Sequence, residues 1–98
     1  LPMVLLGDFN EAAGSSAVYS KLVDSGAFVD TWEAASRRLT PAWGTDTEYA
    51  PPVDGGVRID WILARPRGLD VQAAAVNPWT LGGRWPSDHA AVQALIAF

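Results

Sequence analysis

The segment 57–64 alternates between apolar and other side chains, which is the period of a β-strand. Its apolar side chains share one face of the predicted strand: Val57, Ile59, Trp61 and Leu63. The opposite face carries Arg58, Asp60 and Ile62. A carboxylate inside a strand costs free energy unless it is paired. The pattern therefore predicts a partner for Asp60, either Arg58 on the same face or the single histidine of the chain, His89.

Other segments predict a mixed α/β layer. The apolar run 3–6 is typical of a strand covered on both faces. A helix is expected over 16–25, where Gly26 stops it, and a short helix follows the N-cap Asp30 and runs through residue 35 or 36. Two further strands and two long loops complete the predicted order, namely strands 69–76 and 89–98 and loops 38–56 and 77–87.

Length and composition are typical of a single globular domain and exclude several other classes of protein. Ninety-eight residues suit one domain, and 49% hydrophobic with 18% charged residues is typical of a globular chain. No apolar run approaches the ~18 residues of a membrane span, so we expect no stable insertion into a bilayer. Without cysteine, a disulfide framework, a zinc finger and a thiol nucleophile are excluded. A net charge of −4 with one lysine disfavours duplex DNA as a partner.

Three polar clusters lie at strand ends or inside strands: Gly-Asp-Phe-Asn at 7–10, Arg-Ile-Asp-Trp at 58–61 and Ser-Asp-His at 87–89. Each has an ordinary structural explanation when taken alone. Asp and Asn are common turn formers, Asp60 has Arg58 nearby, and a lone histidine is more often structural than catalytic.

Together and in this order, the three clusters resemble the endonuclease/exonuclease/phosphatase superfamily, which includes DNase I-like nucleases, inositol polyphosphate 5-phosphatases and sphingomyelinases. The Trp-Pro-Ser-Asp-His form at 85–89 is most similar to bacterial members of unassigned substrate. The resemblance implies half of a four-layer α/β/β/α sandwich, with one mixed, mostly antiparallel sheet and helices on one face. Residues 1–98 would form the C-terminal portion of that domain, with the N-terminal half absent. Localisation would then depend on the missing region.

The resemblance also implies a role for five residues. Asp8 matches the aspartate that positions or activates the attacking water, and Asn10 matches the asparagine that binds the phosphate. Asp88 matches the metal-side aspartate, so that Asp88 and Asp8 are the expected metal ligands. His89 matches the phosphate-contacting histidine, and Asp60 the aspartate that pairs with it. The implied cofactor is Mg²⁺, with Mn²⁺ as an alternative, and the chemistry is hydrolysis of a phosphoester by water.

The family's principal glutamate ligand, and an asparagine, belong to its N-terminal half. We therefore expect the 98-residue chain alone to bind metal poorly and to hydrolyse little or nothing. A non-catalytic binding module is the alternative function. A small or lipid-linked phosphoester is favoured over duplex DNA. An uncovered apolar sheet face predicts self-association. In the loop before Ser-Asp-His, Trp79 and Trp85 either pack internally or stack on a substrate sugar, base or lipid. Arg84 is expected at the surface.

Overall fold

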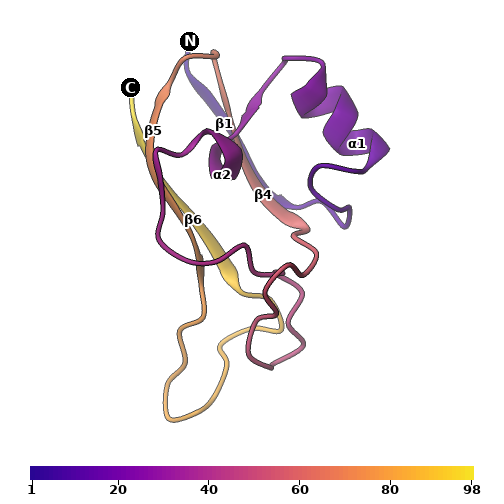
Figure 1. Cartoon of the computed structure of the whole chain (residues 1–98), viewed down its shortest axis with the longest axis vertical. Helices are drawn as coiled ribbons and strands as arrows, with labels where there is room; N and C mark the ends of the chain where they lie inside the picture. The colour runs from indigo at the N-terminus through magenta and orange to yellow at the C-terminus, as the bar shows by residue number, and fades with distance from the viewer.

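The strands form two three-stranded sheets in the computed structural model, which describes all residues from Leu1 to Phe98 (Figure 1). The first sheet has the order β1-β4-β2, made of Met3–Asp8, Asp60–Arg65 and Val29–Asp30. The second has the order β3-β5-β6, made of Arg37–Arg38, Asp70–Asn77 and Ala91–Ala97. All pairs are antiparallel except β3 with β5.

The expectation of one sheet is wrong. β4 and β5 follow each other in the sequence, yet they belong to different sheets, which meet where β4 contacts β6. An alternating pattern identifies the buried face of a strand but not its hydrogen-bonding neighbour. For this reason the pattern could not divide the strands between the sheets.

Both predicted helices are confirmed. Ala17–Tyr19 (α1) continues into a π-helical stretch, Ser20–Asp24 (η1), and the Ser16 side chain accepts a hydrogen bond from the Tyr19 N–H. Thr31–Ala34 (α2) begins after Asp30, whose side chain accepts from the Trp32 N–H. These caps satisfy donors that the first helical turn leaves free. No helix has the length and apolar character needed to cross a membrane.

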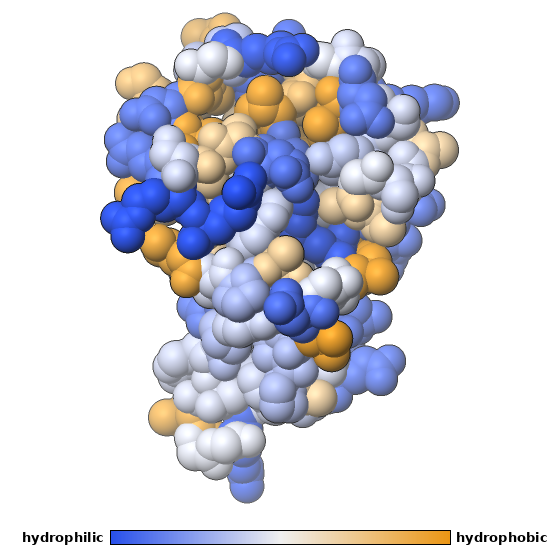
Figure 2. Space-filling model, in the orientation of Figure 1, coloured by the Kyte–Doolittle hydropathy of each residue, from blue (hydrophilic) through white to orange (hydrophobic).

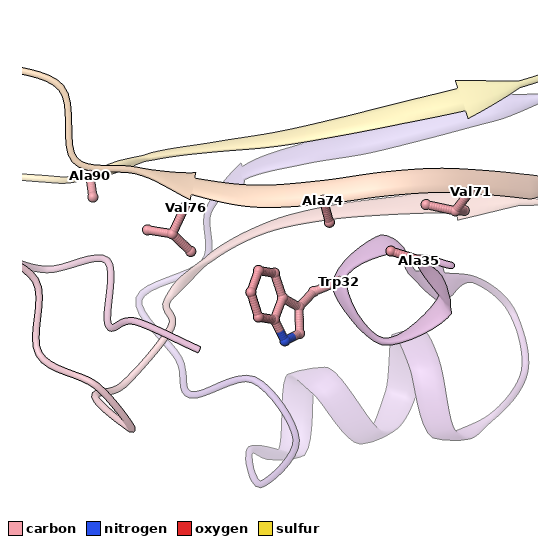
Figure 3. Packing of buried hydrophobic residues seen from close by; sticks show 6 residues of the cluster. All are labelled: Trp32, Ala35, Val71, Ala74, Val76 and Ala90. Carbon is pink, nitrogen blue, oxygen red and sulfur yellow. The ribbon is translucent and has the colours of Figure 1, made fainter. Parts of the chain in front are cut away.

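The core consists of two buried clusters, one for each sheet. Trp61 and Leu63 of β4 are fully buried beneath Tyr19 of α1, and the predicted core position of Trp61 is confirmed. The second cluster joins α2 to β5 and to the residue after His89; Figure 3 shows its members, Trp32, Ala35, Val71, Ala74, Val76 and Ala90. The helices thus pack on the sheets and leave the strand ends free for a site.

β1 differs from its prediction. Its apolar residues Met3, Val4, Leu5 and Leu6 are all exposed, so the expectation of cover on both faces is wrong for this chain. β1 is an edge strand that pairs only with β4. The apolar run correctly predicted a strand, but it could not predict what covers it.

The long loops carry order of their own. Strand β4 begins at Asp60 rather than Val57, and β6 begins at Ala91 rather than His89. The loop before β4 folds back on itself through an isolated bridge between Trp43 and Asp54. Figure 1 shows the loop between β5 and β6 extending away from both sheets, at the opposite end from the two termini.

Candidate active site

Asp60 and His89 form a hydrogen-bonded pair at the ends of their strands. The distance from His89 Nδ1 to Asp60 Oδ2 is 2.8 Å. The alternative partner, Arg58, binds the buried carboxylate of Asp30 instead. Because β4 begins at Asp60, Arg58 lies before the strand. The alternation of side chains along β4 therefore does not place Arg58 on the same face as Asp60. Of the two predicted partners of Asp60, the structure therefore shows His89 and not Arg58.

The strand register brings Asp8 to the same place. Asp8 ends β1 directly opposite Asp60, the first residue of β4. Its Oδ2 lies 3.9 Å from His89 Nε2, the ring nitrogen that does not bind Asp60. Asp8, Asp60 and His89 each offer one ligand atom, and these atoms lie within 4.8 Å of one another. Residues separated by as much as 81 positions thus converge on one point.

Asn10 and Asp88 lie at the margin of this cluster. The backbone N–H of Asn10 donates to Asp8 Oδ1 at 2.8 Å, and Asn10 adopts a left-handed φ of 52°. Asn10 thereby orients the Asp8 carboxylate through its main chain, while its side chain is exposed. Asp88 is also exposed, and its carbonyl accepts from the N–H groups of Thr47 and Glu48 at 3.0 and 2.8 Å. Neither side chain joins the group of three.

Sequence reasoning missed Asp46. Its Oδ1 lies 3.8 Å from His89 Nε2, and the two residues form an isolated β-bridge. The carboxylate is half exposed, so it is open to solvent and to a ligand. Asp46 lies in a loop without a recognisable motif, and the unusual length of that loop was the sole available signal.

The surroundings favour a charged imidazole. The hydrogen bond to Asp60 raises the pKa of His89 above its usual 6.5, burial opposes this, and the negative charges of Asp60, Asp8 and Asp88 raise it further. A histidine held in this way keeps one orientation and presents Nε2 to the cleft.

A cleft of about 470 Å³ extends from this cluster between the two sheets. Asp8, Asp60 and His89 line one part of it, and Trp79 and Trp85 line another. Trp79 is 55% exposed, which excludes internal packing for that residue, whereas Trp85 is half-buried. Arg84 is exposed, as expected.

The donor atoms fit a hard divalent cation. Carboxylate oxygens from Asp8 and Asp46 are accessible, and Mg²⁺ needs one or two carboxylates while it keeps several waters. Four carboxylates lie near the His89 imidazole and would repel an anionic substrate, namely those of Asp8, Asp46, Asp60 and Asp88. A bound cation would offset that repulsion.

Comparisons with known proteins identify the fold. The chain superposes on a mannosyl-6-phosphatase of Bacteroides thetaiotaomicron with a TM-score of 0.84, at 28% identity over 100% of this chain and 38% of that one. A second protein of that organism, from the endonuclease/exonuclease/phosphatase family, gives 0.82 at 30% identity, over 96% and 35%. A functionally unknown conserved protein of Enterococcus faecalis gives 0.78 at 32%, over 98% and 36%. No curated protein matches the chain.

The two mostly antiparallel sheets, with an acidic and histidine cluster at one edge, therefore define a DNase I-like fold. The sequence model of the Endonuclease/Exonuclease/phosphatase family matches residues 1–89, and the chain belongs to that family. The predicted resemblance and fold class are confirmed. The chain spans little more than a third of the length of the solved relatives.

Proposed function

We propose that this chain carries the catalytic residues of a metal-dependent phosphoesterase. The observation that supports the proposal is the Asp60–His89 hydrogen bond of 2.8 Å, with Asp8 Oδ2 at 3.9 Å from the other ring nitrogen, at the wall of a cleft. A histidine oriented by a carboxylate beside metal-binding oxygens is suited to phosphoester hydrolysis.

Each residue has a role in this proposal. Asp8 and Asp88 would hold Mg²⁺ or Mn²⁺, with Asp46 as a further oxygen ligand. When bound, the cation neutralises charge on the phosphoryl oxygens. Asp60 accepts from His89 Nδ1–H, so the imidazole stays fixed and its Nε2–H faces a phosphoryl oxygen. The Asn10 side chain offers a neutral donor where another carboxylate would repel the substrate.

The substrate proposed is a small phosphoester rather than duplex DNA. The net charge of −4 disfavours binding to a DNA backbone. The apolar part of the cleft, with the exposed Trp79, suits a sugar or another ring attached to the phosphate. One structural relative is a mannosyl-6-phosphatase, which supports a sugar phosphate as the first substrate to assay.

Two measurements test the proposal. Binding of Mn²⁺ to the 98-residue chain should broaden the NMR signals of Asp8 and His89 before those of Arg84 in the neighbouring loop. The chain extended upstream to the length of its solved relatives, called the completed protein below, should hydrolyse a sugar phosphate with Mg²⁺. The chain alone should hydrolyse little of it. Strong cleavage of plasmid DNA by the completed protein would overturn the substrate ranking, and absence of hydrolysis would overturn the function.

We further propose that the 98-residue chain self-associates. The exposed apolar residues of β1 lie on an unpaired strand edge, which is a template for pairing with a second copy. Figure 2 shows apolar side chains interrupting the hydrophilic surface in several places. Light scattering at tens of micromolar should give the mass of a dimer or larger species, and a monomer would contradict the proposal.

A further inference from the structure

Thr45 is a polar residue with no exposed surface. Its hydroxyl oxygen, Oγ1, accepts two backbone hydrogen bonds from the approach to β4. One comes from the N–H of Ile59 at 3.0 Å, and the other comes from the N–H of Asp60 at 3.2 Å. The hydroxyl of this loop residue therefore holds the main chain of the aspartate that binds the histidine.

The main chain of Thr45 binds the other side of the site. Its carbonyl accepts from the N–H of Ala90, the residue after His89, at 2.9 Å. Its own N–H donates to the carbonyl of Val57 at 3.1 Å. One buried residue thus connects the segment of Asp60 to the segment of His89.

Two segments of the loop before β4 approach each other closely, and this approach lets Thr45 lie against the start of β4. A Cβ built on Gly44 would lie 3.0 Å from the carbonyl carbon of Gly56, and one on Gly56 would lie 2.9 Å from the carbonyl oxygen of Val53. Real Cβ atoms rarely approach so closely, so glycine at both positions lets the two arms of the loop touch. The loop is thereby held against β4, with the Thr45 side chain directed inward.

We propose that Thr45 is a positioning residue that fixes the placement of Asp60 relative to His89. This inference rests on the proposed function, because it assigns Thr45 to the same site. Thr45 does not itself line the cleft; it acts through its hydrogen bonds to the backbone of Asp60 and Ala90. Catalysis by oriented groups is sensitive to displacements of about 1 Å, which can cost on the order of 100-fold in rate. A residue that sets the distance between Asp60 and His89 should therefore affect the rate of the proposed reaction.

The test uses three variants of the 98-residue chain, labelled with ¹⁵N. Thr45→Val keeps the shape but removes the acceptor, and Thr45→Ser keeps the acceptor. Thr40→Val is the matched control, because Thr40 Oγ1 accepts from the Val76 N–H at 3.0 Å in the other sheet. His89 is the only histidine, so its ring nitrogen signals are unambiguous. The hydrogen bond to Asp60 selects the tautomer protonated at Nδ1.

We expect the neutral imidazole to be mostly Nδ1-protonated in the wild type, in Thr45→Ser and in Thr40→Val. In Thr45→Val the fraction of this tautomer should fall. In the completed protein, Thr45→Val should lower kcat by about 10- to 100-fold with little change in KM. Wild-type tautomer ratios in a folded Thr45→Val chain, or a lost preference in Thr45→Ser, would overturn the proposal.

A measurement on the native chain covers the case in which Thr45→Val does not fold. The amide protons of Ile59 and Asp60 should exchange as slowly as that of Leu63 in the middle of β4. Rapid exchange at both amides, beside slow exchange at Leu63, would show that Thr45 does not hold them and would also overturn the proposal. A chain that keeps the tautomer but neither binds Mn²⁺ nor completes an active protein would refute the proposed function and leave the positioning role intact.

Discussion

Arg58 and Asp60 are two residues apart, yet they belong to two charged clusters that differ in burial and in hydrogen bonding. In the first, Arg58 and the Tyr19 hydroxyl both bind the carboxylate of Asp30, whose side chain is 1% exposed. In the second, Asp60 binds His89, whose side chain is 25% exposed, and Asp8, whose side chain is 40% exposed, lies near the other ring nitrogen.

The difference separates an ion pair that is saturated and buried from one that is open to a cleft. Asp30 also accepts from the Trp32 N–H at 3.0 Å, so its oxygens are occupied and closed to solvent. Burial and the nearby Asp30 carboxylate raise the pKa of the Tyr19 hydroxyl, which therefore remains a donor. In the second cluster, Asp8 and the Nε2 edge of His89 face a cleft. A group with free hydrogen-bonding capacity beside a cleft can act on a ligand, whereas a saturated buried group can only hold the fold.

The largest expected effect is on activity. Asp60→Asn in the completed protein should lower kcat by about 10²- to 10⁴-fold, because the imidazole loses the carboxylate that orients it and favours its charge. Steady-state assay with a sugar phosphate measures the loss. Asp70→Asn, an exposed change in β5 outside the cleft, serves as the matched control. A fall of less than about threefold in kcat would contradict the idea that the Asp60–His89 pair acts in the reaction whereas the Arg58–Asp30 pair only stabilises the fold.

The next effect is on stability. Asp30→Ala should lower the free energy of unfolding by about 3–5 kcal/mol, because it leaves a buried guanidinium without its partner. Tyr19→Phe removes one hydrogen bond from the same carboxylate and should cost about 1 kcal/mol. Urea unfolding followed by tryptophan fluorescence measures both. Asp30→Ala with wild-type stability would mean that the buried pair contributes nothing to the fold.

A third effect depends on pH. Since the pKa of His89 is higher in the folded chain than its usual 6.5, protonation stabilises the fold. This stabilisation is complete below the unfolded pKa and is lost as the pH rises through the folded one. Urea unfolding at several pH values should show the decrease, and Asp60→Asn should reduce it because the principal cause of the shift is gone. An unchanged slope in Asp60→Asn would assign the pH dependence to other groups.

The smallest effect concerns the far part of the cleft. Trp79→Ala should raise KM for a sugar phosphate by about 2- to 10-fold, the contribution of one aromatic contact. Stability should change by no more than about 0.5 kcal/mol, because the side chain is exposed. Glycerol phosphate, which has no ring, provides the control substrate. Equal KM changes for both substrates would argue against stacking.

Much of the secondary structure follows from local sequence. The alternation before Ala64 predicted a strand with Trp61 inward, and Ser16 and Asp30 marked the helix starts, since a cap acts within one turn. The three polar clusters indicated the family, which the match over residues 1–89 confirms. The Asp60–His89 pair is observed, but the predicted site roles of Asp8, Asn10, Asp60, Asp88 and His89 stay predictions.

Other features depended on contacts between distant parts of the chain. The sequence alone left Asp60 with two partners, because Arg58 is adjacent in sequence while His89 is 29 residues away. The contact between β4 and β6 decides between them, and the bridge from the loop before β4 to His89 brings in Asp46, which no motif identifies. Local patterns determine the conformation of a segment because they act within a few residues. The chemistry of a site depends on which segments meet, and that is decided by the fold as a whole.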